Sequence, residues 1–143
     1  MRLRPGTAQD LDALDEIFAH AREEMFAYLP RLHTGEEDRG FLAHLLETTE
    51  VWVAEEDGRV AGFVSLSGDL LGHVYVRPRG RGIGSALLDQ AKRLRPDGFH
   101  LWVFQRNGGA RRFYERHGLT LVELTDGAGN EEREPDARYE WRP

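Results

Sequence analysis

The stretch from Val74 to Leu88 holds the residues of this 143-residue chain that are best suited to binding chemistry. Its arginines and glycines alternate along the chain: Arg77, Arg79, Gly80, Arg81, Gly82 and Gly84. Glycine lets a backbone turn tightly and approach a ligand closely, and arginine carries a permanent positive charge. The stretch therefore predicts an anion-binding loop, with a loop that merely needs glycine as the alternative.

Two familiar phosphate loops do not fit this stretch. A Walker loop closes with Gly-Lys-Ser/Thr, whereas Gly84 is followed by Ser85 and Ala86. A dinucleotide-binding loop is followed about 20 residues later by an acidic residue, but here the segment from Leu101 to Arg106 contains none. A nucleotide-binding protein is therefore a third choice, and stabilisation of the fold by ATP or NAD would test it.

The loop must lie between a strand and a helix. Leu70 to Val76 is an apolar run before the loop, and from Ile83 to Leu94 the apolar residues recur at helical spacing. Phe99 to Phe104 is apolar at almost every position, as expected of a strand covered on both faces. A strand, a helix and a second strand in this order predict a parallel pair flanking the loop.

The chain before the loop predicts two helices and a meander. We expect a strand at 2–4, a helix from the N-cap Thr7 to about Tyr28, a helix from the N-cap Thr34 to about Thr48, and strands at 51–54, 60–66 and 70–76. Asp57-Gly58 between two β-branched runs is a strong hairpin signal. These strands should therefore run antiparallel.

The chain after the parallel pair predicts one helix and two strands. Asn107 is placed as the N-cap of the helix and Gly118 as the glycine that ends it. We expect strands at 119–124 and 138–141, joined by a polar loop at 125–137. The final strand is expected at a solvent edge, where it could pair across a homodimer.

Composition places the chain among ordinary globular proteins. Hydrophobic residues make up 40% and charged residues 31%, which with this length predicts a single domain over residues 1–143. The net charge of −6 argues against general nucleic-acid binding, and the lack of any apolar span or leader argues against a membrane and for a cytoplasmic protein. No cysteine is present and the six histidines have no ligand-like spacing, so no metal is expected.

Two motifs on these elements resemble the GNAT superfamily of N-acetyltransferases. They are Arg79-x-x-Gly82-x-Gly84 and Asn107-x-x-Ala110-x-x-Phe113-Tyr114-Glu115-x-x-Gly118-Leu119. The resemblance covers essentially the whole chain and implies an α/β GNAT fold: a mixed, mostly antiparallel sheet of about six to seven strands, about four helices, and a parallel pair at an acyl-CoA cleft. One departure is that Pro78 is followed directly by Arg79, where such families usually have two more residues, so the loop is expected to be tighter.

The resemblance implies acetyl-CoA as cosubstrate and names the residues that would hold it. Main-chain groups of Val74 and Val76 would pair with the pantetheine arm, and amides from Arg79 to Ser85 would hold the pyrophosphate. Asn107 would contact the cofactor or act only as an N-cap. The cofactor-binding residues implied are Val74, Val76, Arg79, Gly80, Arg81, Gly82, Ile83, Gly84, Ser85 and Asn107.

The resemblance also implies the catalytic residues. Tyr114 stands where the family places a tyrosine near the CoA sulfur, and a phenol with a reference pKa of about 10 can donate its proton to a leaving thiolate. Packing in the core is the alternative role for Tyr114. His73 is the candidate general base, acting through water, with a structural histidine as the alternative and Asp69 as the second candidate base.

The expected activity is acetyl transfer by direct attack of a primary amine of a small molecule or a peptide. The resemblance implies that the polar loop containing Glu131, Glu132 and Glu134 borders the acceptor site, with a solvated surface loop as the alternative. The alternative from another class is a non-catalytic, CoA-binding regulatory module. Transfer to a panel of amines would separate the two.

Overall fold

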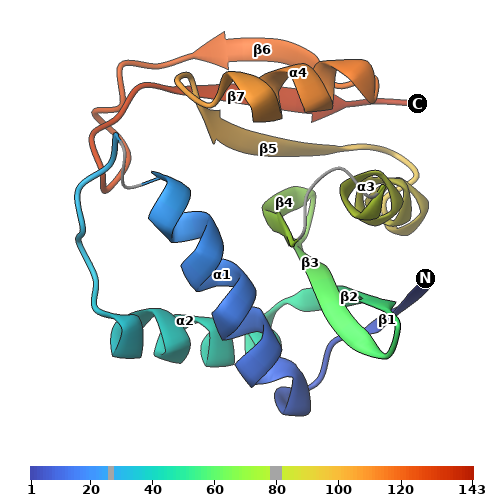
Figure 1. The fold of residues 1–143 in the computed structure, drawn as a ribbon. Coiled ribbons are helices and arrows are strands. Elements are labelled where there is room, and N and C mark those ends of the chain that lie inside the picture. The colour runs from blue at the N-terminus through green and yellow to red at the C-terminus, as the bar shows by residue number, and fades with distance from the viewer. Residues whose placement is uncertain (26–27, 78–81) are drawn as a thin grey trace.

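The fold is a mixed sheet with helices on both faces, as the sequence predicted. The computed structural model describes residues 1–25, 28–77 and 82–143. The elements in chain order are β1 (Arg2–Pro5), η1 (Ala8–Asp10), α1 (Leu11–Met25), α2 (Gly35–Thr48), β2 (Glu50–Glu56), β3 (Arg59–Ser67), β4 (Leu70–Val76), α3 (Ile83–Leu94), β5 (Phe99–Phe104), α4 (Gly108–Arg116), β6 (Thr120–Leu124) and β7 (Asp136–Trp141). Figure 1 shows their arrangement.

Seven strands form one sheet in the order β1-β2-β3-β4-β5-β7-β6. Only β4 and β5 run parallel, and the other neighbours are antiparallel. The predicted meander is confirmed by the β2–β3 hairpin, in which Asp57 and Gly58 both have positive φ, as a tight two-residue turn requires. The predicted parallel pair is likewise the pair β4–β5.

Both predicted helix starts are confirmed by their caps. Thr34 Oγ1 accepts from Glu37 N at 3.1 Å, and Glu37 Oε1 accepts from Thr34 N at 2.9 Å, which is a capping box. Thr7 and Asp10 form the same reciprocal arrangement ahead of η1. The described part of α1 runs to Met25, and the expected end near Tyr28 falls beside residues 26 and 27, which lie outside the described residues. Tyr28 lies in a turn, because Pro30 disfavours a helical Leu29.

The last strand does not lie at an edge of the sheet, contrary to our expectation. β7 begins at Asp136 and pairs with β5 on one side and β6 on the other. After the edge strand β6 the chain runs back between β6 and β5 as β7. Hydrogen bonds to both neighbours satisfy the backbone groups of β7. β1 and β6 are therefore the two edges of the sheet.

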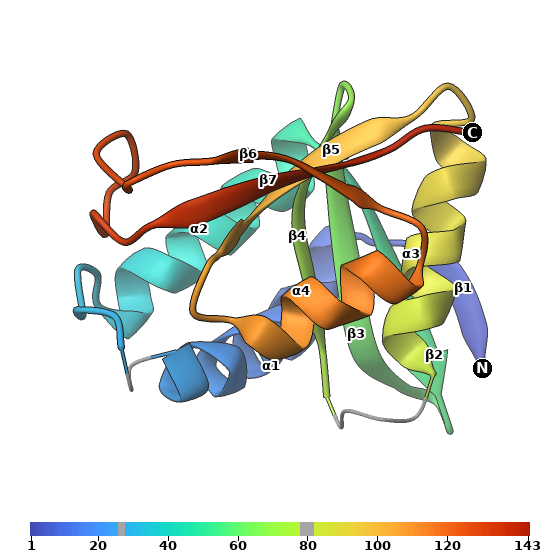
Figure 2. The ribbon, with the colours of Figure 1, turned by 90° about the horizontal axis from the view of Figure 1, so that it is seen from above.

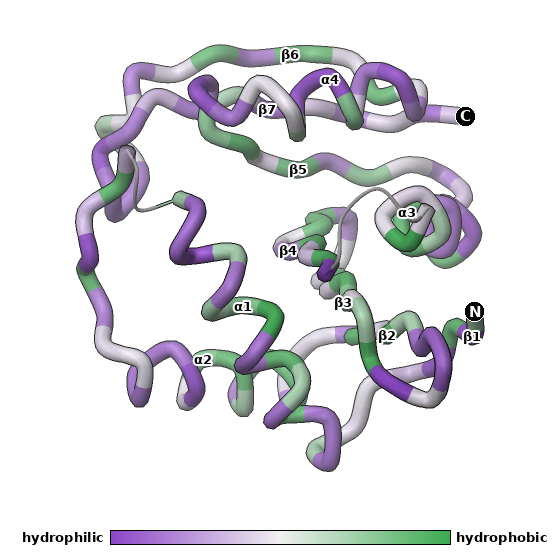
Figure 3. The backbone as a smooth tube through the Cα atoms, in the orientation of Figure 1, coloured by the Kyte–Doolittle hydropathy of each residue, from purple (hydrophilic) through white to green (hydrophobic). Residues whose placement is uncertain are grey.

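Two hydrophobic cores lie on opposite faces of the sheet. One packs α3 and Tyr114 of α4 against the strands, and the other packs α1 and α2 against β2 and β3. Figure 2, viewed from above, shows α1 and α3 on opposite sides of β3 and β4. Figure 3 shows that the side of α3 facing these strands is hydrophobic and its outer side hydrophilic. None of the helices in the described ranges is long and apolar enough to cross a membrane.

Candidate active site

The cavity that could hold a substrate lies where β4 and β5 separate. Their only paired residues are Leu70 and His100, near the start of each strand. Beyond this pair, a cavity of about 1150 Å³ is lined by residues of both strands, with α1 on one face and the start of α3 and α4 on the other. The cavity therefore connects the two faces of the sheet.

A β-bulge in β4 accompanies this separation. Ser65 of β3 pairs with His73, and the next residue of β3, Leu66, pairs with Leu71, so Gly72 is an extra residue on β4. Such a bulge bends its strand and increases the local twist. Because Gly72 follows the last pair with β5, the bend lies where β4 leaves its parallel neighbour.

The main-chain groups of Val74 and Val76 face the cavity rather than β3. Arg77 N donates to Ala61 O of β3 at 2.7 Å. In an antiparallel ladder every second residue directs its main-chain N–H and C=O groups at the neighbouring strand, so those of Tyr75 and His73 also face β3. The N–H and C=O groups of the intervening Val74 and Val76 then point to the side where β5 has left. The structure thus offers unpaired strand groups at both residues that the sequence named for the pantetheine arm.

The start of α3 offers free amides at the same cavity. Gly82 caps the helix with φ 77° and ψ 4°, a left-handed conformation, and its carbonyl accepts from Ala86 N at 3.1 Å. The amides of Ile83, Gly84 and Ser85 precede Ala86, whose amide is the first to donate within the helix, and they have no partner within it. Gly82, Gly84 and Ser85 line the cavity. The Ile83 side chain is 1% exposed and belongs to the core.

The remaining loop residues named from the sequence lie outside the described residues. These are Arg79, Gly80 and Arg81, together with Pro78. The three amides from Ile83 to Ser85 are therefore the part of the predicted anion site that can be described.

Close packing brings β4, α3 and α4 together around this helix start. A Cβ on Gly62 would lie 2.9 Å from Val76 Cγ1 and 3.0 Å from Ile83 Cγ2. A Cβ on Gly84 would lie 3.3 Å from Phe113 Cζ of α4. Two glycines thus allow β3 and α3 to approach their neighbours closely, which places the free amides beside the bent strand.

Tyr114 lies in the wall of the cavity and is 8% exposed. Burial, with a smaller contribution from Tyr75, raises the pKa of Tyr114 above its ordinary value. The phenol thus keeps its proton at neutral pH. No hydrogen bond joins its hydroxyl to another of the described residues, so that proton is available to a ligand.

Asn107 holds the start of α4 at the cavity. Its side-chain oxygen accepts from Ala110 N at 3.1 Å, which confirms the predicted N-cap. The residue also lines the cavity. The cap orients α4 so that Tyr114, two helical turns further on, faces the gap between the strands.

His73 and Tyr75 line the cavity from β4 and face α1 and α2. The rings of His73 and Phe41 lie 5.3 Å apart, as do those of Tyr75 and Phe18. Burial lowers the pKa of His73 to about 4, and its Nδ1 lies 3.1 Å from Ser65 Oγ. His73 is therefore a neutral imidazole at pH 7. The second candidate base, Asp69, is not among the residues that line the cavity; its carboxylate lies 3.5 Å from His100 Nδ1.

Three of the four carboxylates in the segment from 131 to 136 have partners. Glu131 Oε1 lies 2.5 Å from His33 Nε2, and Glu134 Oε1 lies 2.7 Å from Arg106 Nε. Asp136 accepts hydrogen bonds from Thr125 Oγ1 and Asn130 Nδ2. No hydrogen bond or ion pair joins the half-buried Glu132 to another of the described residues.

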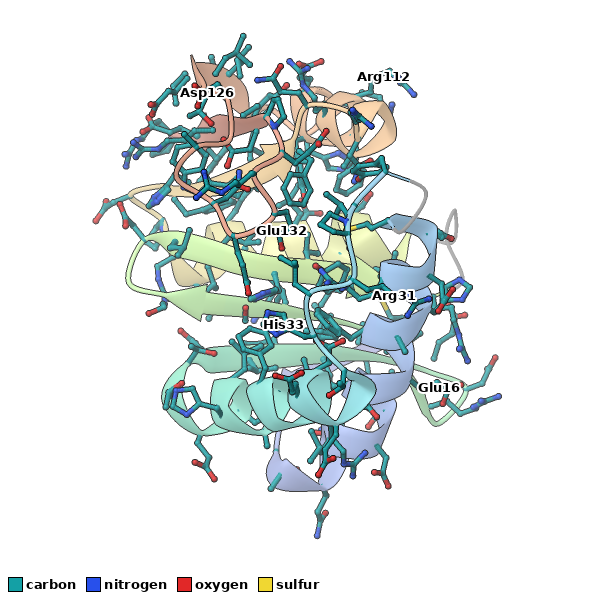
Figure 4. The ribbon with its side chains drawn as sticks, turned by 90° about the vertical axis from the view of Figure 1, so that its left-hand side faces the viewer. Glu16, Arg31, His33, Arg112, Asp126 and Glu132 are labelled. Carbon is teal, nitrogen blue, oxygen red and sulfur yellow. The ribbon has the colours of Figure 1, made fainter. Side chains whose placement is uncertain are left out.

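Glu132 lies within electrostatic reach of Tyr75. Burial raises the pKa of Tyr75 to about 12, while Arg22 opposes the rise and Glu132 adds to it. Figure 4 shows Glu132, which belongs to the β6–β7 loop, above His33, which lies between this loop and α2. Tyr75 thus borders the cavity on the face opposite to α4, and Glu132, which is not among the residues that line the cavity, lies close enough to affect its phenol.

Sequence reasoning missed Tyr75 and His117. Tyr75 alternates with Val74 and Val76 on β4, so its two-residue spacing from His73 could have placed both rings on one face. His117 follows the last residue of α4 and lines the cavity. Among the described ranges, no group of three or more His, Cys, Asp or Glu residues is arranged to hold a metal ion.

Comparisons with known proteins agree with this geometry. The family model described as Acetyltransferase (GNAT) domain matches residues 47–119. A peptidyl-lysine N-acetyltransferase of Escherichia coli K12, YiaC, is 38% identical over 81 residues, which are 54% of this chain and 55% of the relative. The match thus spans about half the length of that curated relative.

Solved structures resemble the whole chain. A GCN5-related N-acetyltransferase from Rhodopseudomonas palustris has a TM-score of 0.82 and 22% identity, covering 99% of this chain and 95% of its own. The PaiA N-acetyltransferase of Thermoplasma acidophilum, solved in complex with coenzyme A, has a TM-score of 0.80 and 20% identity, covering 99% and 98%. At these identities the likeness establishes the fold. With the family model matching about half of the chain, this protein belongs to the GNAT acetyltransferase family.

Proposed function

We propose that this protein is an acetyl-CoA-dependent N-acetyltransferase that acts on a primary amine of a small molecule or peptide, with residues 1–143 forming one acetyltransferase domain. The observation that carries the proposal is the cavity between β4 and β5, which reaches both faces of the sheet. A thioester entering from one face would meet an amine entering from the other. The similarity to a peptidyl-lysine N-acetyltransferase favours a lysine side chain among the acceptors.

The cosubstrate would lie along the residues named from the sequence. The free amides of Ile83, Gly84 and Ser85 suit the pyrophosphate, since a helix start attracts anions. Arg79, Gly80 and Arg81 precede them and, with Gly82, complete the proposed loop. The unpaired groups of Val74 and Val76 suit the amides of the pantetheine arm, and Asn107 lines the same cavity. The likeness to a fold solved with coenzyme A supports this placement.

A thermal shift measurement tests the cofactor site. Ligand that binds only the folded state raises Tm by mass action, so millimolar CoA should raise the Tm of the protein. Gly82→Val should abolish the shift, because valine is strained at φ 77° and would crowd the pyrophosphate. An undiminished shift in a folded Gly82→Val protein would exclude this loop as the anion site.

The residues of the cavity suit direct transfer. The neutral amine attacks the thioester carbonyl, a C–N bond forms, and the C–S bond then breaks. Tyr114 would give its phenolic proton to the departing thiolate and recover one from solvent. His73, with its pKa near 4, would accept the amine proton only in passing and release it to water. This route needs no covalent enzyme intermediate, which suits a chain without cysteine.

The acceptor would meet Glu132 and Tyr75 on the face of α1 and α2. Of the four acids in the segment from 131 to 136, Glu132 is the one without a partner among the described residues. A half-buried carboxylate attracts a cation and disfavours an anion. We therefore place the incoming ammonium group, or a second cationic group of the acceptor, beside Glu132.

An amine panel distinguishes an enzyme from a non-catalytic CoA-binding module. Release of CoA thiol is followed with a lysine-containing peptide, a peptide with only a free N-terminal amine, and small primary amines. The enzyme should release thiol in proportion to acetylated product with at least one cationic amine. A protein that binds CoA but acetylates none of them is the regulatory module. We also propose a cytoplasmic location, and any homodimer formed through strand pairing would use one of the two edge strands, β1 or β6.

A further inference from the structure

The contact between Ser85 and His117 joins the start of α3 to the end of α4 at the cavity wall. Ser85 Oγ lies 2.9 Å from His117 Nε2, and both residues line the cavity. The imidazole also packs against the Phe113 ring, with centroids 4.3 Å apart. Lys92 Nζ donates to the carbonyl oxygen of His117 at 2.6 Å, which fixes the backbone at that point. The two side chains are thus held together by contacts on both helices.

The second hydrogen bond of His117 determines where its proton sits. His117 Nδ1 lies 2.8 Å from the carbonyl oxygen of Phe113, which can only accept. Nδ1 therefore carries the proton in the neutral ring, and Nε2 accepts from the Ser85 hydroxyl. In this state the single proton of Ser85 points at the histidine, so only lone pairs of its oxygen remain for the cavity.

Protonation of Nε2 reverses this hydrogen bond. Both ring nitrogens of an imidazolium ion are donors, so Nε2 donates to Ser85 Oγ and the hydroxyl proton becomes free to turn outward. A phosphate oxygen at the α3 start then meets a hydroxyl donor beside the free amides, with a positive charge behind it. Charge-assisted hydrogen bonds of this kind are stronger than neutral ones.

We infer that His117 is a positioning residue that couples proton uptake to cofactor binding: a pyrophosphate at the α3 start is held by the Ser85 hydroxyl when His117 is protonated. The inference rests on the proposed function, since it assumes that the anion at this helix start is the pyrophosphate of CoA. Affinity is then higher in acidic solution, where His117 carries the second proton, than in alkaline solution, where it does not. Release of product CoA is correspondingly faster in alkaline solution.

Other charged groups surround this pair and must be separated from it. Lys92 contacts the His117 carbonyl from α3, Asp89 lies one turn beyond Ser85 on the same helix, and Arg116 precedes His117 and lines the cavity. A substitution of His117 alone leaves all three of these groups in place. His20 and His73 also line the cavity, so a test must isolate His117 from them.

The experiment measures proton uptake when dephospho-CoA binds. This probe keeps the pyrophosphate but lacks the 3′-phosphate, which would itself exchange protons near pH 6. Calorimetric titrations in two buffers of different ionisation enthalpy give the number of protons taken up. Wild type should take up a fraction of a proton at pH 7, and its Kd should be about tenfold lower at pH 6 than at pH 8.

Two variants and one control assign the proton. His117→Gln keeps a side-chain N–H for Ser85 and should bind with no proton uptake and a pH-independent Kd. Ser85→Ala should bind more weakly, through the amides alone, and also without uptake. His44→Gln removes an exposed histidine of α2 and should behave as wild type.

Two results would overturn the inference. Binding of dephospho-CoA to wild type without proton uptake, or uptake that persists in His117→Gln, rejects the role of this histidine and leaves the proposed function intact. Failure of wild type to bind the probe at any pH between 6 and 8 rejects the proposed function and the inference with it.

Discussion

Tyr114 carries the sharpest prediction at the level of single residues. Tyr114→Phe keeps the ring that packs against Phe113 and Tyr139 and removes only the proton. Positioned proton transfer typically contributes about 10² to 10⁴-fold, so kcat should fall by that order while CoA affinity and Tm persist. A variant that turns over at the wild-type rate, with chemistry shown to limit kcat, would make Tyr114 a packing residue.

Glu132 should determine the affinity for a cationic acceptor. Glu132→Gln removes the carboxylate of its segment that has no partner among the described residues, and it should raise the acceptor KM about tenfold, corresponding to the loss of one charge-assisted contact. The Kd for CoA should not change. Glu131→Gln is the matched control, because Glu131 already pairs with His33, and it should change the acceptor KM much less. Equal effects in both variants would show that the loop attracts cations only by its total charge.

His73 should make the fold sensitive to mild acid. Its folded pKa of about 4 lies below the ordinary value near 6.5, so the unfolded chain binds more protons between these two pH values. The stability that this neutral imidazole contributes is complete above about pH 6.5 and is lost as the pH falls toward 4.

Urea unfolding at pH 7, 6 and 5 measures this loss. His73→Gln should have a shallower decline than wild type, by up to about 1.4 kcal/mol per pH unit. The lowered pKa of Asp10, caused mainly by its hydrogen bonds from Arg4, adds a loss only at more acidic pH. Parallel declines in the two proteins would mean that His73 does not titrate in this range.

At the level of elements, the close contact of β3 with β4 and α3 should be essential to the cavity. Gly62→Ala places a methyl group 2.9 Å from Val76 Cγ1 and 3.0 Å from the carbonyl oxygen of Tyr75. Overpacking typically costs about 1 to 3 kcal/mol, and β4 must shift, so both Tm and CoA affinity should fall.

Gly40→Ala is the matched control for this change. A Cβ at Gly40 would meet nothing within 4 Å, and the residue lies inside α2, where alanine is favoured over glycine. Its Tm should therefore rise slightly, and CoA affinity should not change. If Gly62→Ala bound CoA as wild type does, the position of β4 would not depend on this contact.

Local signals explain which elements could be predicted from the sequence. The capping boxes at Thr7 and Thr34, the Asp57-Gly58 turn and the N-cap Asn107 act over a few residues, and each of these predictions is confirmed. The position of β7 depends on long-range pairing with both β5 and β6, which no local pattern specifies. The bulge at Gly72 was missed for the same reason, because it appears only in the register against β3.

The same distinction holds for the candidate site. The family motifs named Val74, Val76, Gly82, Gly84, Ser85, Asn107 and Tyr114, and the structure brings them to one cavity. The partners of the loop acids could not be predicted, since His33 reaches Glu131 across 98 residues of sequence. Burial of Tyr75 and the hydrogen bond between Ser85 and His117 likewise depend on how separate helices pack.

At the level of the whole molecule, the proposed acetyl transfer depends on a cavity that joins the two faces of one sheet. The proposed cofactor half is lined by residues of α3 and α4, and the proposed acceptor half by residues of α1 and the β6–β7 loop. Binding of CoA and attraction of a cation could each occur without the other. Only transfer of an acetyl group from the cosubstrate to the acceptor requires both halves to meet where β4 and β5 separate.

The most direct test is a mass-spectrometric assay of acetyl transfer from acetyl-CoA to a lysine-containing peptide, with free CoA thiol measured in the same samples. The proposed function predicts that the peptide gains one acetyl group for each thiol released. Tyr114→Phe should lower the rate of peptide acetylation about 10² to 10⁴-fold. If the Tm of the protein rises with CoA but neither this peptide nor any amine in the panel is acetylated, the proposed acetyltransferase activity is wrong.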